Sequence, residues 1–333
     1  MSDSCRPTLP DLCLIDRSDR SRIEITGPDR AKFLHNLTTN EVKRLPAGRG
    51  CEAFVTSAQG KTIGYVTILA DENRILVRTD PGGMELALPH LTKYGMFDDV
   101  TIEDRSEATF ELHILGEGVD ALVRRGAVAP PDAPELTHRI SELGGRPVRL
   151  VREAPAGIAG ITILGERADA DTVTATLAAF ADGVGLAVLE PAEFEALRIE
   201  AGTPAFGKDI TEKNLPQEFA RDDRAISFIK GCYLGQETVA RIDALGHVNQ
   251  FLRGLTFEPG SCCPAPGASL EADGKRVGAI TSAADSPWRG HPVALAMVRA
   301  AHARAGTPLS LAVEGSDRPL IATVVDLPFP PRA

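Results

Sequence analysis

The sequence lacks the cysteine patterns that hold structural metals. Its six cysteines include no C-x-x-C pair, and none lies near a histidine at zinc-finger spacing. The count is even, but a chain of 333 residues without a secretion signal usually keeps its thiols reduced. We therefore expect no structural zinc site, no disulfide framework and no metal ligands.

Long apolar runs and a surplus of basic residues are also missing. The longest apolar segments, such as residues 293–298, are strand-sized and fall well short of the ~20 residues that span a bilayer. Residues 1–20 contain no apolar signal-peptide core, and their aspartates are atypical of a mitochondrial transit peptide. Lys and Arg total 36 against 46 Asp and Glu, which gives a net charge of −10. We expect a cytoplasmic protein without a membrane segment or a direct, high-affinity nucleic-acid partner.

What the sequence does contain is a globular composition with mixed secondary-structure patterns. Apolar residues make up 43% and charged residues 25%, and the length predicts two or three domains. Strand-like and helix-like segments alternate without a regular βαβ repeat, which favours an α+β fold. Beyond about residue 250 the helical periodicity disappears, and short strand patterns separated by Gly, Pro, Asp or Ser predict a β-barrel or sandwich: 251–257, 275–281, 292–298, 308–313 and 320–327.

The segment Lys230–Glu237, K-G-C-Y-L-G-Q-E, carries the strongest chemical signal. Two glycines permit a tight turn, and a helix is expected directly after it. Cys232 then lies beside Lys230 and near a helix N-terminus, and both neighbours favour the thiolate. The same residues also fit a structural turn in which Cys232 packs and Lys230 is solvated. The sequence places no histidine next to Cys232 as a base, although His247 is a candidate in space.

A second segment combines Arg198 and Glu200 in R-I-E-A-G at the end of a predicted helix. A carboxylate there is able to accept paired N–H groups from a pterin-like or guanine-like ring. The alternative is that both side chains cap or solvate the helix end.

Together these segments resemble the YgfZ family, folate-binding relatives of the glycine cleavage T-protein that act in iron–sulfur enzyme maintenance. The family signature K-G-C-[FY]-x-G-Q-E matches at every fixed position of Lys230–Glu237. The resemblance extends to G-x-D-x-x-x-F-L at 27–34, to R-x-E-x-G at 198–202, and to G-x-V-T-S at 278–282, where Ile280 replaces the valine. The match is weakest between about 105 and 185.

The resemblance implies an α+β, T-protein-like ring of three domains around a tetrahydrofolate cavity, with a C-terminal β-barrel. We expect an N-terminal α+β domain over 1–105, a second α+β domain over 106–245 that carries the K-G-C motif, and the barrel over 246–333, with the first two domains able to interleave. The resemblance marks Cys232 and Lys230 as catalytic candidates. It marks as folate-binding candidates the following residues: Glu200, Arg198, Tyr233, Gln236, Glu237 and Glu218.

One departure concerns the acidic pair of aminomethyl-transferring T-proteins, which follows the first hairpin turn. Gly64 and Tyr65 stand where the two acids are expected. A glycine cannot replace a positioned carboxylate, so glycine cleavage activity is disfavoured.

Three functions follow from the resemblance. The first is a tetrahydrofolate-binding accessory protein for iron–sulfur cluster assembly or repair, with iron–sulfur client enzymes or assembly proteins, including tRNA-modifying ones, as partners. The second is a folate-dependent one-carbon transferase, aminomethyltransferase-like or demethylase-like. The third is an interaction scaffold with a vestigial pocket.

Overall fold

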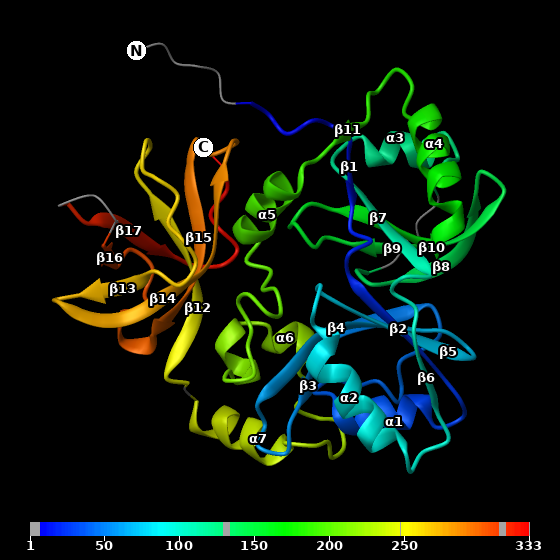
Figure 1. The fold of residues 1–333 in the computed structure, drawn as a ribbon, viewed down its shortest axis with the longest axis horizontal. Coiled ribbons are helices and arrows are strands. Elements are labelled where there is room, and N and C mark those ends of the chain that lie inside the picture. The colour runs from blue at the N-terminus through cyan, green and yellow to red at the C-terminus, as the bar shows by residue number, and fades with distance from the viewer. Residues whose placement is uncertain (1–6, 129–133, 247, 313–317, 333) are drawn as a thin grey trace.

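The computed structural model describes residues 7–128, 134–246, 248–312 and 318–332. Three units surround a common centre (Figure 1): a β-barrel on the left, one sheet with its helices at the upper right and another at the lower right. Helices α5 and α6 lie between the barrel and the two sheets. The expected α+β ring is confirmed.

Sheet 1, at the lower right, has five strands in the order β3-β4-β5-β2-β6. Its apolar face is covered by two helices because alternate residues, such as Ile23, Val55, Val66 and Val77, point to that side. The elements are β2 (Ser21–Thr26), α1 (Arg30–Leu37), β3 (Arg49–Thr56), β4 (Thr62–Ala70), β5 (Arg74–Thr79), α2 (Met84–Gly95) and β6 (Thr101–Asp104).

The opposite, inner face of sheet 1 is polar and aromatic. Glu52 and Phe54 of β3 pair with Thr67 and Tyr65 of β4, and all four lie on the face opposite the apolar core. This face turns toward the centre of the ring and supplies a wall of the cavity described below.

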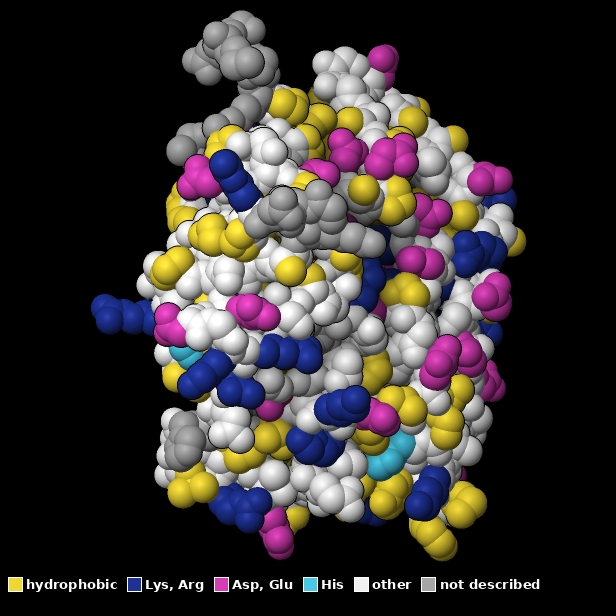
Figure 2. Space-filling model, turned by 60° about the vertical axis from the view of Figure 1, so that its left-hand side comes forward, with side chains coloured by type: hydrophobic (Ala, Val, Ile, Leu, Met, Phe, Trp, Pro, Cys, Tyr) yellow, Lys and Arg dark blue, Asp and Glu magenta, His cyan; other side chains and the backbone are white. Residues whose placement is uncertain are grey.

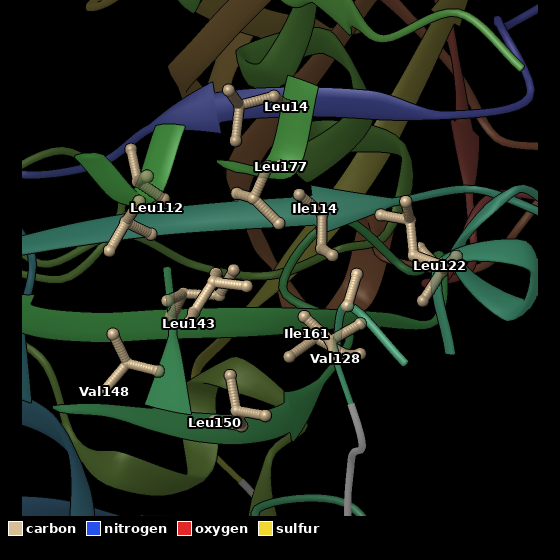
Figure 3. Packing of buried hydrophobic residues seen from close by; sticks show 14 of the residues in the cluster. Leu14, Leu112, Ile114, Leu122, Val128, Leu143, Val148, Leu150, Ile161 and Leu177 are labelled. Carbon is tan, nitrogen blue, oxygen red and sulfur yellow. The ribbon is translucent and has the colours of Figure 1, made fainter. Parts of the chain in front are cut away.

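Sheet 2 has six strands in the order β11-β1-β7-β10-β9-β8. Its core is aliphatic, and Figure 3 shows Leu112 and Ile114 of the central strand packed with Leu122 and Leu177 of the covering helices. The elements are β1 (Cys13–Asp16), β7 (Thr109–Leu115), α3 (Val119–Arg124), β8 (His138–Leu143), β9 (Arg146–Glu153), β10 (Gly160–Glu166), α4 (Ala170–Phe180) and β11 (Ala187–Val188).

Strand β1 pairs with β7, so the chain enters sheet 2 before it builds sheet 1. The two α+β units are therefore interleaved in sequence. Domain boundaries near 105 and 245 remain a proposal. Strand β1 is the exception to the first, because it precedes residue 105 but belongs to sheet 2.

Buried charges join the two sheets. Arg78 of sheet 1 is fully buried and donates through both terminal nitrogens to Glu153 of sheet 2, at 3.2 and 2.7 Å. Arg20 donates to the buried Glu111 at 2.9 Å. Nearby arginines, Arg20 and Arg78 foremost, hold the pKa of Glu111 down at about 2 despite its burial, so they face a carboxylate that stays ionised.

The connection and the barrel complete the chain. The connection contains α5 (Pro191–Glu200), a 3-10 turn (Pro216–Phe219), α6 (Asp222–Ala225) and α7 (Gln236–Leu245). The barrel closes in the order β12-β15-β14-β13-β16-β17, which confirms the predicted barrel. Its strands are β12 (Gln250–Phe257), β13 (Ser269–Ala272), β14 (Lys275–Ser286), β15 (His291–Arg299), β16 (Pro308–Leu311) and β17 (Leu320–Val325). The sequence pattern missed β13, and the predicted end of the fourth strand at Val313 lies outside the described residues.

Candidate functional site

A cavity of about 520 Å³ lies where the three units meet. That volume is within the range of small-molecule sites. Both sheets, the connection around α5 and α6, and the segment after β17 contribute to it. Its charged and aromatic lining includes Arg17, Arg20, Glu52, Tyr65, Asp80, Glu135, Glu153, Arg198, Phe219, Arg221 and Arg224, with Leu327 and Pro328 from the C-terminal segment.

Glu52 and Tyr65 form a hydrogen-bonded pair on the sheet 1 wall. The Tyr65 hydroxyl donates to Oε2 of Glu52 in a short contact. Burial holds the pKa of Tyr65 well above its usual value near 10, so the hydroxyl keeps its proton. Arg224 donates through Nε to the other Glu52 oxygen at 2.8 Å and through Nη2 to Glu135 at 2.8 Å. The cavity wall therefore carries a carboxylate group held in a fixed direction.

Arg221, which lines the cavity, also carries a donor without a partner. Nε of Arg221 is buried and has no hydrogen-bond partner within the described residues. A buried donor without a partner is costly, and because the atom is covered it does not by itself mark a ligand contact.

Gly64 and Tyr65, which replace the acidic pair, face opposite sides of sheet 1. A Cβ placed at Gly64 meets the Cβ of Ala87 in α2 at 3.3 Å and Val55 at 3.4 Å. A side chain there points into the apolar helix layer. Tyr65 points into the cavity, where its hydroxyl holds Glu52.

Among the binding residues predicted from the sequence, Arg198 lines the cavity and Glu200 does not. Arg198 is held by Glu195 and Asp209 on both sides of its guanidinium. Glu200 is 7% exposed and turns toward the barrel. Its Oε1 accepts from Ser286 at 2.7 Å, and its Oε2 lies 2.9 Å from both Arg289 and Arg332.

Lys230 is buried against α1. Its ammonium donates to the carbonyls of His35, Thr38 and Asn40, at 2.6, 2.6 and 2.8 Å, where α1 ends. These carbonyls have no partner inside the helix, and the negative end of the helix dipole favours a cation there. Burial lowers the pKa of Lys230 to about 8. In the structure Lys230 fixes its loop to the C-terminal end of α1 and lies outside the cavity lining.

Cys232 is exposed on the outer side of the same loop. Its neighbours Ile229, 99% exposed, and Phe228, 47% exposed, place apolar surface beside the thiol. The His247 proposed as a base lies outside the described residues.

Gly235 of the signature lets its loop dock on the first hairpin of sheet 1. Gly235 has φ +83°, and a Cβ there meets the Ser57 carbonyl oxygen at 2.4 Å. Gly60, at the hairpin turn, has φ +74° and leaves similarly little room beside Thr238. Gly235 thus serves packing between two segments distant in sequence.

The remaining predicted residues lie around this loop and outside the cavity lining. Tyr233 is buried, and its backbone N–H donates to the Gln236 side chain at 3.3 Å. Glu237 is exposed in the first turn of α7. Glu218 is buried and accepts from Asn214 at 2.7 Å. The cavity and the signature loop are therefore two separate features.

Sequence reasoning missed Glu52 and Arg224. A signal for Glu52 was present, because a charged residue directly before the buried apolar run Ala53–Val55 requires a partner or a function. Arg224 sits in the polar run Arg221–Arg224, which by itself is indistinguishable from a solvated turn.

Other classes of site find little support in the part of the chain that the structure describes. There, no three or more His, Cys, Asp and Glu side chains gather in a way that would hold a metal ion, and no helix has the length and apolar character needed to cross a membrane. On the face in Figure 2, Lys and Arg are interspersed with Asp and Glu, the pattern of an ordinary solvated surface.

Comparison with known families identifies both parts of the chain. Residues 2–227 match the GCVT N-terminal domain, and residues 251–330 match the glycine cleavage T-protein C-terminal barrel domain. The chain belongs to the glycine cleavage T-protein family. Its likeness to the aminomethyltransferase T of Bartonella henselae, with a TM-score of 0.85 over 98% of this chain and 88% of that one at 19% identity, shows the same fold.

Relatives of this T-protein family member carry different names. A putative chloroplastic transferase of Arabidopsis thaliana is 31% identical over 81% of this chain, which spans only 61% of that protein. An aminomethyltransferase of Streptomyces avermitilis is 28% identical over 95% of this chain and 86% of its own length. The tRNA-modifying protein YgfZ of Colwellia psychrerythraea is 27% identical over 72% of this chain and 69% of its own.

Proposed function

We propose that this protein binds a reduced folate in the central cavity and acts as an accessory protein for iron–sulfur enzymes, including tRNA-modifying ones. The observation that carries the proposal is the separation of two features. A cavity of about 520 Å³ with charged and aromatic lining lies between the three units. The signature cysteine, Cys232, lies at the surface beside exposed apolar side chains, where a partner protein reaches it. The full K-G-C-Y-x-G-Q-E match and the YgfZ-named relative support the same assignment.

The cavity fits a folate in its donor set. The Glu52 carboxylate suits the N–H groups of a pterin, and the aromatic rings of Tyr65 and Phe219 suit its flat face. The guanidinium of Arg221, which lines the cavity, suits a carboxylate or carbonyl of the ligand. Bound tetrahydrofolate supplies one-carbon acceptor chemistry, and the protein positions it and limits access of water.

Cys232 is proposed to act at the partner rather than at the folate. An exposed thiol is able to accept the outer sulfur of a partner's persulfide, which leaves as a thiol, or to make a transient cluster contact. One cysteine provides one of the four ligands of an ordinary iron–sulfur cluster, so a stable cluster needs a partner's ligands as well.

Direct binding tests the folate part of the proposal. Anaerobic calorimetry with tetrahydrofolate should give micromolar affinity, which Thr67→Trp should abolish because Thr67 lines the cavity. Thr67→Val, which adds no bulk, separates obstruction from loss of the hydroxyl. If wild type releases no heat with tetrahydrofolate and its melting temperature does not change when tetrahydrofolate is added, the protein does not bind folate. The interaction scaffold would then replace the folate-binding proposal.

The accessory role is tested in cells that lack the gene. Cys232→Ser should fail to restore the activity of iron–sulfur tRNA-modifying enzymes, although the purified variant should bind folate like the wild type. Full restoration by Cys232→Ser would remove Cys232 from the mechanism.

A one-carbon transferase is the second candidate, supported by the relatives named as aminomethyltransferases and by the Glu52–Tyr65 pair in the cavity. This function predicts turnover of a methylated amine to methylene-tetrahydrofolate. An accessory protein binds folate without forming that product.

A further inference from the structure

The signature loop is fixed to the last turn of α1 at two points. Lys230 donates to the carbonyl of His35 at 2.6 Å. The backbone N–H of Leu234 donates to the carbonyl of the next residue in the helix, Asn36, at 2.8 Å. Cys232 lies halfway between these two anchors and is exposed. The loop therefore carries its cysteine next to the C-terminal end of α1.

Gly231, the residue before Cys232, faces the ring of His35. A Cβ placed on Gly231 would lie 3.6 Å from Nε2 of His35, and among the described residues no other atom beyond the adjoining chain comes within 4 Å of it. The φ of Gly231 is not in the left-handed region, so neither backbone strain nor crowding requires a glycine here. What the missing side chain leaves open is Nε2 of His35.

A carboxyl group holds the other nitrogen of the His35 ring. Nδ1 lies 3.1 Å from Oε1 of Glu41. The backbone N–H of Lys43 lies 3.4 Å from the same nitrogen, which is long for a hydrogen bond. An ionised carboxylate accepts hydrogen bonds and does not donate them, so the closer contact favours the tautomer with the proton on Nδ1. Nε2 is then an acceptor, and none of the described residues donates to it.

The charges around His35 keep its ring ready to accept a proton. Burial and the nearby Lys230 lower the pKa of His35 below its usual value, Lys43 acts in the same direction, and Glu41 opposes them. The imidazole is therefore neutral at pH 7. Lys230 does not compete as a base, because its ammonium is bound by three carbonyls.

We infer that His35, oriented by Glu41, is the base that takes the proton of the Cys232 thiol when this cysteine reacts with a partner's persulfide. This inference rests on the proposed role of Cys232. Within the described residues the two side chains share no hydrogen bond. The exposed thiol reaches Nε2 by rotation about its Cα–Cβ bond or through one water, as is common before a reactant binds.

The transfer step balances without a further reactant. The thiol proton of Cys232 passes to Nε2 of His35, and the thiolate bonds to the outer sulfur of the partner's persulfide. The sulfur–sulfur bond of that persulfide breaks, and its inner sulfur leaves as a thiol with the proton from Nε2. One sulfur atom moves from the partner to Cys232, with no net oxidation or reduction.

The test is the rate at which iodoacetamide alkylates Cys232 in the full chain, followed by peptide mass spectrometry at several pH values. An isolated thiol with the usual pKa near 8.5 is about 3% thiolate at pH 7, which leaves room for up to about 30-fold activation by a base. Wild type should react about 10-fold faster than His35→Gln at pH 7, and the two rates should converge above about pH 9.5, where the thiolate forms without a base. Cys262, which is also exposed, is the internal control and should react alike in both proteins.

Two variants test the arrangement while His35 stays in place. Gly231→Ala should slow alkylation of Cys232 at pH 7 by about 3-fold or more without a change in melting temperature, because its methyl group would lie over Nε2. Glu41→Gln should slow it by a similar factor at pH 7 and not above about pH 9.5, since it weakens the base and leaves the thiolate itself unaffected. His90→Gln is the matched control: His90 is a half-buried histidine of α2 whose ring packs on Tyr94, and its replacement should change neither rate.

Cells that lack the gene separate this inference from the proposed function. His35→Gln should restore the iron–sulfur enzymes only in part. If Cys232→Ser fails to restore them while His35→Gln restores them fully, the role of His35 falls alone. It also falls if Cys232 is alkylated equally fast at pH 7 in wild type, His35→Gln and Gly231→Ala. If Cys232→Ser restores the enzymes fully, the proposed function of Cys232 fails, whereas the alkylation rates still decide whether His35 activates the thiol.

Discussion

Replacing Lys230 by methionine removes a buried ammonium from the end of α1 and keeps a long apolar stem. Three carbonyls lose their donor, those of His35, Thr38 and Asn40. Hydrogen bonds to a charged group each contribute roughly 1.5–3 kcal/mol, so three contribute roughly 4.5–9 kcal/mol. Burial of the charge offsets part of this, because a pKa lowered from 10.5 to about 8 corresponds to roughly 3.4 kcal/mol. We expect Lys230→Met to lower the unfolding free energy by about 3 kcal/mol.

The assay is denaturant unfolding at pH 7 with Lys61→Met as the control. Lys61 also donates to a backbone carbonyl, that of Lys213 at 2.7 Å, but on the exposed surface. Its replacement should cost less than about 1 kcal/mol. Equal stability of Lys230→Met and wild type would refute the stabilising role of these hydrogen bonds. Lys230 would then return to the catalytic role that its sequence position suggests.

The pH dependence of the same comparison has a defined sign. The pKa of Lys230 is lower in the folded protein, about 8, than its usual 10.5, so between these values the unfolded chain binds more protons. Stability then rises with pH through this window. The unfolding free energy of wild type relative to Lys230→Met should increase by about 2 kcal/mol from pH 7 to 9.5. A decrease would contradict the assigned cause.

Three further predictions concern stability. Burial lowers the pKa of His113 to about 4, and its Nε2 has no partner in the described residues. The unfolding free energy should therefore fall as pH drops from 6.5 to 4, because the unfolded chain binds the proton more readily. Thermal melts across that range should show a smaller loss of stability for His113→Gln than for wild type. Gly235→Ala should cost more than about 2 kcal/mol in denaturant unfolding, because the new Cβ meets the Ser57 oxygen at 2.4 Å in a left-handed backbone. Cys232→Ser should leave the melting temperature unchanged, because the thiol is exposed; a large drop would mean that the loop packs against something.

Several features of this protein are determined by sequence alone. The strand patterns beyond residue 250 predict the barrel because strand periodicity and turn residues act locally. The helix after Gly235 and the tight turn around it follow from the same local rules. The K-G-C-Y-x-G-Q-E match indicated a T-protein relative, and the family models confirm that coarser assignment.

The tertiary structure decided which side chains face the cavity. Glu52 and Arg224 are 172 positions apart and meet only when α6 packs on β3. Glu200 turns away because the barrel offers Ser286, 86 positions later, as its donor. Lys230 looks like a free cation in the sequence, but it bonds a carbonyl 195 positions earlier. Local patterns set strands, helices and turns, whereas the direction of a charged side chain depends on partners brought together by the fold.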